Sequence, residues 1–351
     1  MRQLLSLLVV ITVLGGCKKP PVELTVTSDF VNGFFALNEG LFQQNNASLS
    51  FYSLATQKMH HSVFSSINGR GLGDTANDMI QFTFNGKLYY AIAVNVSSQV
   101  EIIDGLTMES VAQIGLFDNG IGREPRSLQY QNDVIYSINF DGTVSLIDMN
   151  SLTETTTISV GDNPESSLIY QNKLYVINTG GLNFPNYDST ISVIDLQNNL
   201  VVDEFTCGLN GARLITDEAG DGYMIARGNY SNIEPKLVRL DLSNYKVEAE
   251  YNFNIVTMAY SNNHIYYYDD IENAIRRFDT QTETNNPAVF IDCSDFENVY
   301  NIQVNAEQQL VYVVDANGYV NSSIIRIYDM TGKFQREIIS GLNSNSLVFS
   351  P

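Results

Sequence analysis

Residues 191–195 have the sequence Ile-Ser-Val-Ile-Asp, an alternating apolar run that ends in aspartate, and similar runs recur along the chain. Successive copies end 38 to 51 residues apart. Equivalent runs end at Asp104, Asp148, Asp241, Asp279 and Asp329, and a diverged first copy, Leu49-Ser-Phe-Tyr-Ser53, ends in serine. Alternating apolar residues are typical of a β-strand, and aspartate after a strand is typical of a turn. The chain therefore contains seven strand-and-turn units, and we expect each aspartate to cap the turn that follows it.

The period of this repeat predicts the fold. Self-similarity at about 40–50 residues in strand-like sequence is typical of the blades of a β-propeller. Each repeat has room for four strands, here named A to D in chain order. In the third repeat we predict them at 127–130, 134–139, 143–148 and 155–160. No segment shows helical periodicity, so the predicted fold class is all-β, a seven-bladed β-propeller with four-stranded blades.

The two ends of the chain predict how the ring closes. The first repeat has candidate B, C and D strands at 34–37, 49–51 and 59–64, but no A strand of its own. The C-terminal stretch Asn345-Ser-Leu-Val-Phe349 is similar to the predicted A strand Arg126-Ser-Leu-Gln-Tyr130. We therefore expect the last residues to complete blade 1, which would remove a free sheet edge and make residues 30–351 one propeller domain.

The N-terminus is not expected to belong to the propeller. Arg2 precedes an apolar stretch at 4–14 that is too short to span a membrane as a helix. The following Leu14-Gly-Gly-Cys17 resembles a bacterial lipobox, which implies cleavage before Cys17 and acylation of that cysteine. The resemblance predicts a signal peptide at 1–16, a lipidated tether at 17–29 and an outer-membrane location, because Lys18 follows the cysteine. An ordinary signal peptide with an incidental cysteine is the alternative.

The composition excludes some partners. The chain has 39 acidic and 19 basic side chains and a formal charge of −20. Nucleic acids and anionic lipid surfaces require a basic footprint, so neither is an expected partner. The remaining cysteines, Cys207 and Cys293, fall in non-adjacent blades, too far apart for a disulfide, and we expect two free thiols.

A ring of polar residues is the first candidate binding site. The B-to-C and D-to-A loops of a propeller share the face around the mouth of its central channel. The residues that end the seven B strands are Asn38, Asn95, Asn139, Asn178, Arg227, Asp269 and Asp315. Such a ring supplies donors and acceptors without a nucleophile, so we predict a binding protein and not an enzyme, with no cofactor and no metal. Asn and Asp also cap turns, which is the structural alternative.

Other residues on the same face extend this candidate site. Glu39 follows the first B strand, and Arg126 and Arg213 lie near the starts of A strands, as do Arg70 and Arg123 in the preceding loops. Arginine suits a carboxylate or phosphate ligand, although each could instead pair with a local acid. The longer loops carry aromatic residues that offer contact area to a large ligand. These residues are Phe42, Phe117, Phe184, Tyr187, Tyr230 and Tyr319.

Two sets of motifs resemble known propellers. The stretches 162–164, 173–178 and 190–195 resemble the YVTN-type repeat of YncE-like proteins. The stretches 33–40, 45–52 and 68–75 resemble surface-lipoprotein propellers of the Bacteroidetes, a group that includes the cobalamin-capturing BtuG-like proteins. The resemblance implies a corrinoid ligand and a TonB-dependent outer-membrane transporter as partner. The sequence Lys18-Lys-Pro-Pro21 lacks the acidic tract that often marks surface export, so the membrane face stays open.

Three functions remain as hypotheses at this point. The leading one is a lipid-anchored propeller that captures a nutrient for an outer-membrane transporter. The second is a protein-interaction scaffold in the cell envelope that uses the same face. The third is a metal-dependent lactonase, in which oxygen ligands from Glu39, Asn95, Asn139 and Asp315 would hold calcium.

Overall fold

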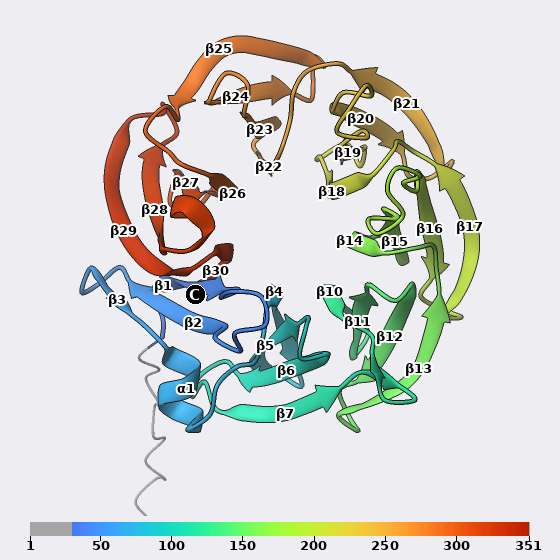
Figure 1. The fold of residues 1–351 in the computed structure, drawn as a ribbon, viewed down its shortest axis with the longest axis vertical. Coiled ribbons are helices and arrows are strands. Elements are labelled where there is room, and N and C mark those ends of the chain that lie inside the picture. The colour runs from blue at the N-terminus through green and yellow to red at the C-terminus, as the bar shows by residue number, and fades with distance from the viewer. Residues whose placement is uncertain (1–29, 351) are drawn as a thin grey trace, which may run out of the picture.

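The computed structural model describes residues 30–350, and in it seven four-stranded antiparallel sheets surround a central axis (Figure 1). This confirms the predicted seven-bladed β-propeller. The predicted signal peptide and Cys17 lie outside the described residues. No helix within residues 30–350 is long and apolar enough to cross a membrane.

Each blade is a meander in which strand A is innermost and strand D outermost. From A to D, blade 1 comprises β30 (Ser344–Ser350), β1 (Gly33–Asn38), β2 (Ser48–Ser53) and β3 (Lys58–His60), and blade 2 comprises β4 (Ala76–Phe84), β5 (Lys87–Val94), β6 (Gln99–Asp104) and β7 (Ser110–Gly115). Blade 3 comprises β10 (Pro125–Gln131), β11 (Val134–Asn139), β12 (Thr143–Asp148) and β13 (Thr153–Ser159), and blade 4 comprises β14 (Pro164–Tyr170), β15 (Lys173–Asn178), β16 (Thr190–Asp195) and β17 (Leu200–Thr206). Blade 5 comprises β18 (Gly211–Thr216), β19 (Gly222–Ala226), β20 (Lys236–Asp241) and β21 (Lys246–Tyr251), and blade 6 comprises β22 (Met258–Ser261), β23 (His264–Asp269), β24 (Ala274–Asp279) and β25 (Thr284–Asp292). Blade 7 comprises β26 (Val299–Asn305), β27 (Leu310–Asp315), β28 (Ser322–Asp329) and β29 (Phe334–Leu342), and a two-stranded sheet of β8 (Phe117–Asp118) and β9 (Ile121–Gly122) lies in the loop before blade 3.

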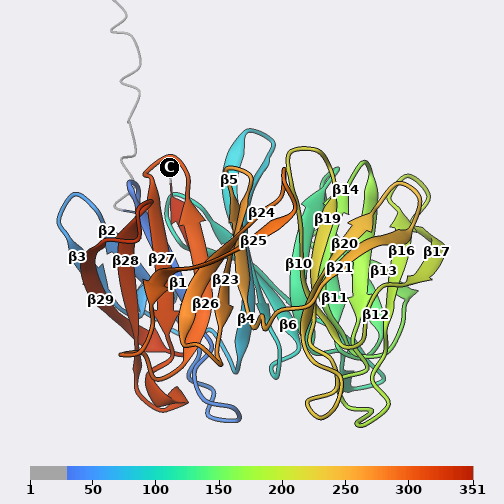
Figure 2. The same cartoon turned by 90° about the horizontal axis from the view of Figure 1, so that it is seen from above.

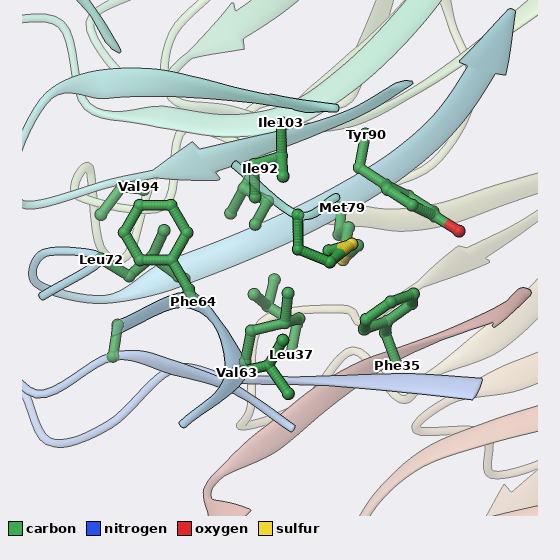
Figure 3. Packing of buried hydrophobic residues seen from close by; sticks show 14 of the residues in the cluster. Phe35, Leu37, Val63, Phe64, Leu72, Met79, Tyr90, Ile92, Val94 and Ile103 are labelled. Carbon is green, nitrogen blue, oxygen red and sulfur yellow. The ribbon is translucent and has the colours of Figure 1, made fainter. Parts of the chain in front are cut away.

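The core consists of seven apolar clusters, one between each pair of neighbouring blades. The B strands are buried along both faces, so their alternate residues enter the clusters on either side. Between blades 1 and 2, Phe35 and Leu37 of β1 pack toward Tyr90 and Ile92 of β5 (Figure 3). A fully buried large side chain contributes about 1.5–3 kcal/mol, so these interfaces hold the ring together.

The repeated aspartates cap the turns after the C strands, as predicted. Asp148 Oδ1 accepts hydrogen bonds from the backbone N–H groups of Asn150 and Ser151 at 2.6 and 3.0 Å. The other five aspartates of the repeat accept equivalent backbone bonds. Ser53, in the diverged first copy, accepts from Thr56 N–H through its hydroxyl at 3.3 Å. The repeat therefore encodes turns, on the face where the A-to-B turns also lie.

The C-terminal strand closes the ring, which confirms the prediction. β30 pairs antiparallel with β1 along its length, from Gly33 opposite Ser350 to Asn38 opposite Ser344. Leu347 of β30 is 3% exposed and belongs to the apolar cluster between blades 7 and 1. Blade 1 is thus built from both ends of the chain.

Some predicted boundaries were wrong. The D strand of blade 1 was expected near 59–64, but β3 has three residues and a short helix, α1 (Val63–Asn68), follows it. Val63 and Phe64 of α1 are buried between blades 1 and 2, so packing and not local periodicity makes this turn helical. The B and C strands of the third repeat match their predictions residue for residue. Cys207 and Cys293 are free and buried, as expected.

The strand directions place the start of the propeller opposite its loop face. Gly33 lies at the end of β1 remote from Asn38, and Asn38 ends the strand at the B-to-C loop. The long B-to-C loops project from one face of the ring, the lower face in Figure 2. The described chain therefore enters the propeller from the face opposite these loops.

Candidate ligand-binding cavity

The innermost strands share an irregularity at their starts. In six blades the register between strands A and B shifts near the first residue of strand A, as in a β-bulge. In blade 3, Pro125 pairs with Asn139 and Ser127 with Ile138, so Arg126 is left unpaired between them. A bulge bends its strand and redirects the extra side chain. The residues at the bulges are Asn77, Arg126, Glu165, Ala212, Arg213, Tyr300 and Asn345.

All of these bulge residues line one cavity of about 540 Å³. Because strand A is innermost and its start lies on the face of the B-to-C loops, the cavity occupies the mouth of the central channel on that face. Glu39, which follows β1, and Arg227, which follows β19, contribute to the same wall. Three arginines and three carboxylates converge in this cavity, and its lining includes no histidine or cysteine.

Of the predicted polar ring, only Arg227 lines the cavity. The other six residues lie at the ends of B strands, one strand further from the channel than the A strands. Asn38, Asn139 and Asn178 are fully buried, and their amides donate to hydroxyls of the neighbouring C strands. Gly161 packs directly against the side chain of Asn178, since a Cβ on Gly161 would lie 2.5 Å from the Asn178 amide. The donors of these amides are used within the blades, and the one unpaired oxygen among them, Asn178 Oδ1, is buried and belongs to a residue that does not line the cavity.

The three other members of that ring are also occupied within the protein. Asn95 Nδ2 donates to Pro125 O at 3.3 Å, and Asp315 accepts from the backbone N–H groups of Glu297 and Asn298. Asp269 accepts from Ile271 N–H and from the Asn254 side chain. None of the six lines the cavity, which is lined instead by the bulge residues of the A strands.

Glu39 joins three blades on one side of the cavity. Its Oε2 accepts from the Tyr300 hydroxyl at 2.7 Å, and its Oε1 accepts from Asn345 Nδ2 at 2.8 Å and Asn77 Nδ2 at 3.1 Å. Burial raises the pKa of Glu39 above its ordinary value, and these hydrogen bonds and Arg126 only partly oppose that shift. The acceptor capacity of Glu39 is used mainly within the protein.

Glu165 carries the charge contacts on the opposite side. Its Oε1 lies 2.7 Å from Arg126 Nη2 and 3.7 Å from Arg227 Nη2. Burial alone would raise the pKa of Glu165, but the two guanidinium groups outweigh burial and lower it. Burial likewise opposes the charge of Arg126, and Glu165 then raises the pKa of Arg126 overall. Two cations and one anion form this group, so it has one positive charge in excess.

Arg213 lies deeper, where the cavity continues down the channel. It lines both the mouth cavity and a second space of about 410 Å³ next to it. Its Nη1 donates to Met258 O at 2.8 Å and to Asn301 Oδ1 at 2.9 Å. Asp78 lines the cavity too and accepts from the backbone N–H groups of Met79 and Leu128. Burial raises the pKa of Asp78 to about 6, against the effect of these bonds and of Arg213.

The predicted loop aromatics lie on loops of the same face as the cavity, but among them only Tyr319 lines it. Phe184 and Tyr230 are each 69% exposed. Tyr187 lies between them, with ring centroids 6.0 Å from each neighbour. We call these three residues the loop aromatic cluster. Phe42 and Phe117 are exposed elsewhere on the loops of this face.

Other predicted candidates have structural partners. Arg70 pairs with Glu101 at 2.8 Å, and Arg123 pairs with Asp141 at 3.0 Å, which is the alternative anticipated for them. The proposed calcium ligands do not converge, because Glu39 lines the cavity and Asn95, Asn139 and Asp315 do not. Within residues 30–350 no three His, Cys, Asp or Glu side chains are grouped to hold a metal ion.

Most cavity residues were missed from the sequence, among them Asn77, Asp78, Glu165, Tyr300 and Asn345. A signal for several of them was present. Pro125-Arg-Ser127 and Pro164-Glu-Ser166 are aligned tripeptides, with a charged residue between a proline and a serine. Reading that central position across all repeats would have selected most of the bulge residues. The bulge itself has no such pattern, because it is a change in pairing between two strands.

The family described as "Domain of unknown function (DUF5074)" matches residues 32–343, which include every strand of the seven blades except β30. The chain belongs to this family. No curated protein matches it in sequence.

Solved structures share the fold at low sequence identity. A quinoprotein alcohol dehydrogenase-like protein from Bacteroides thetaiotaomicron has 17% identity and a TM-score of 0.68, covering 92% of this chain and 79% of that one. Hydrazine synthase from Kuenenia stuttgartiensis has 13% identity and a TM-score of 0.60, covering 91% and 99%. The computationally designed Ika8 protein has 10% identity and a TM-score of 0.57, covering 92% and 97%. At these identities the likeness concerns the fold alone.

Proposed function

We propose that this DUF5074 protein is a binding propeller that holds a polar small molecule at the mouth of its channel. The observation that carries the proposal is the convergence of bulge residues from six blades on one cavity of about 540 Å³. A concave site with a few converging polar groups is the usual form of a ligand site. The cavity has charged groups and amides but no histidine or cysteine, which favours binding over catalysis.

The proposal includes a place in the cell and a task. The lipobox-like sequence around Cys17 supports a lipid anchor in the outer membrane, and the resemblance to Bacteroidetes lipoproteins supports nutrient capture for a TonB-dependent transporter. The described chain enters the propeller opposite the cavity, so an N-terminal anchor leaves the loop face free to meet a ligand. A corrinoid is too broad to enter the cavity whole. A peripheral group of the corrinoid would therefore enter the cavity and meet the charged residues that line it.

The experiment is a calorimetric titration of the chain from residue 18 onward with cyanocobalamin. Binding in the micromolar range is expected, and Arg227→Gln should weaken it because Arg227 lines the cavity. Lys58→Gln, which makes the same charge change on the exposed outer strand β3, is the matched control and should bind as the wild type does. If cyanocobalamin does not bind at micromolar concentrations, the proposal that the ligand is a corrinoid is wrong. Titration with other polar nutrients then tests whether the cavity binds a polar small molecule.

A second candidate is a scaffold that binds a protein partner through the same face. The loop aromatic cluster favours it, because exposed aromatic residues on loops are typical of protein interfaces. The double variant Phe184→Ala/Tyr230→Ala separates the two functions. A scaffold loses its partner from solubilised outer membranes in a pull-down with this variant, whereas a small ligand in the cavity retains its affinity.

A further inference from the structure

We infer that the ligand carries an acidic group, a carboxylate or a phosphate, and that Arg213 binds this group at the base of the cavity. The inference rests on the proposed function and specifies the chemistry of its ligand. It follows from what Arg213 bonds to, what it lacks, and which groups surround it.

Arg213 is anchored at one end and free at the other. Its two short bonds from Nη1, to Met258 O and Asn301 Oδ1, use both hydrogens of that nitrogen. Among residues 30–350, Nε and Nη2 donate no hydrogen bond, and no carboxylate pairs with this guanidinium. Nε and Nη2 form the edge of the guanidinium that matches the two oxygens of a carboxylate or phosphate. The free edge, Nε and Nη2, therefore presents a bidentate donor.

The other arginines of the described chain differ from Arg213. Seven of them have a carboxylate partner. The remaining two are Arg277, which stacks on Phe290, and Arg336, which donates to the Tyr52 hydroxyl. Both of these lie on strands C or D, away from the channel. Only Arg213, within residues 30–350, combines a position in the channel with the lack of a carboxylate partner.

Neutral donors complete the site around Arg213. Ser166, Thr257 and Ser346 line the cavity, and their hydroxyls make no hydrogen bond to another residue in the described part of the chain. Ser346 also lines the second space, as Arg213 does. Hydroxyl donors and one guanidinium are the groups that recognise an oxyanion without needing a metal. They share with Arg213 the cavity that the acidic group would enter.

The carboxylates of the cavity do not substitute for such a ligand. Glu165 is held by Arg126 and Arg227, and Glu39 by three neutral donors. Asp78 accepts two backbone N–H groups and is the one acid whose charge acts noticeably on Arg213. Burial disfavours the charge of Arg213 and lowers its pKa, an effect that a bound anion would offset. The acidic group of the ligand would pair with Arg213, which has no carboxylate partner within residues 30–350.

The test is calorimetry with two acidic probes and one neutral probe. Inorganic phosphate and succinate are the two acidic arms, which distinguish a phosphate from a carboxylate source, and succinamide is the neutral control. We expect the wild type to bind one acidic probe and not succinamide. Arg213→Gln should weaken that binding at least tenfold, and Arg213→Lys should recover part of it. Arg277→Gln is the matched control and should bind as the wild type does. Thermal melts of each variant show whether it folds.

The outcomes separate this inference from the proposed function. Loss of acidic-probe binding in folded Arg213→Gln supports the inference. If a ligand, cyanocobalamin included, binds Arg213→Gln as tightly as it binds the wild type, the acidic-group inference is overturned and the binding function stands. Suppose that the wild type binds neither acidic probe but binds a neutral molecule, and that Arg227→Gln weakens this binding. The acidic-group inference is then overturned as well, and the binding function stands. If it binds no probe, charged or neutral, both are overturned.

Discussion

At the scale of single residues, aspartate has two opposite roles in this propeller. In the turns after the C strands, backbone N–H bonds, led by that of Ser151, lower the pKa of Asp148 below its ordinary value, and those of Thr282 do so for Asp279. In the cavity, burial raises the pKa of Asp78 to about 6. The turn aspartates therefore stay charged as caps. Asp78, whose charge acts on Arg213, instead loses its charge by protonation as the pH falls through about 6.

The pKa of Asp78 predicts how ligand affinity depends on pH. An anion at Arg213 should bind more tightly as the pH falls through about 6, because protonation removes the opposing charge of Asp78. The free energy of unfolding should also rise as the pH falls. A carboxyl whose folded pKa is raised binds protons more tightly when folded, so its contribution to the free energy of unfolding falls as pH rises from about 4 to about 6.

Calorimetry with the acidic probe between pH 4.5 and 7.5 checks this prediction. Glu39 faces the same cavity with a raised pKa, and Glu165, Arg126 and Arg227 complete its charged groups, so the variant must isolate Asp78. In Asp78→Asn the rise in affinity below pH 6 should disappear. A rise that persists in Asp78→Asn and disappears in Glu39→Gln would assign the effect to Glu39.

A second prediction concerns Glu39 as the link between blades 1, 2 and 7. Glu39→Ala removes the acceptor of Tyr300, Asn345 and Asn77 and should reduce the free energy of unfolding by about 1–3 kcal/mol. Glu39→Gln keeps one carbonyl oxygen and should cost less. Urea denaturation followed by circular dichroism measures both. Equal losses in the two variants would show that the hydrogen bonds to Glu39 are not what stabilises this side of the cavity.

At the scale of elements, the strands separate by function according to their distance from the axis. The B strands are buried on both faces and build the interfaces between blades, and the C strands end in the capped turns. The A strands carry the bulges that direct side chains into the cavity. The A strands thus supply most of the cavity residues, while other side chains of the same strands, such as Leu128 and Leu347, belong to the core.

β30 provides the prediction at this scale. Deleting residues 344–351 leaves β1 as a free edge and removes Leu347 from the cluster between blades 7 and 1. Removing one buried leucine side chain costs about 2–5 kcal/mol, and loss of the whole strand should cost more, so the truncated chain should fail to fold at 37 °C. Circular dichroism and limited proteolysis measure this.

A synthetic peptide of residues 343–351 tests the mechanism of that loss. Added in excess, it should restore a folded ring by pairing with β1. The matched control peptide has Leu347→Asp, which places a charge in the apolar cluster and should not restore folding. A truncated chain that melts like the full chain would contradict the role assigned to β30.

At the scale of the whole molecule, the charge of −20 opposes the approach of the acidic ligand that Arg213 is inferred to bind. The repulsion is long-range, and salt screens it over about 10 Å at 0.1 M. The association rate of an acidic probe should therefore rise between 20 and 200 mM salt, whereas that of a neutral ligand should stay constant. Stopped-flow kinetics or surface plasmon resonance measures both. A falling rate would show that the cavity arginines dominate the field met by the incoming ligand.

Much of the molecule could be predicted from local pattern. Val134–Asn139 and Thr143–Asp148 were found residue for residue because alternating apolar residues and a terminal Asn or Asp are written directly in the chain. The closing strand was found because residues 345–349 are similar to the A strand at 126–130. The helix α1 was missed because its burial between two blades, and not its own periodicity, favours it.

The sequence by itself determined the seven blades, their order, the turn caps and the strand that closes the ring, because each depends on a repeat unit that specifies its own strands. Only the tertiary structure decided which polar residues face the channel. Asn139 ends a strand and is buried, while Arg126, in the adjacent strand, reaches the cavity through a bulge. Side chains alternate between strand faces, so one extra residue redirects a side chain, and that shift exists only between paired strands. The ring then brings together residues as far apart as Glu39 and Asn345, whose contact no local pattern encodes.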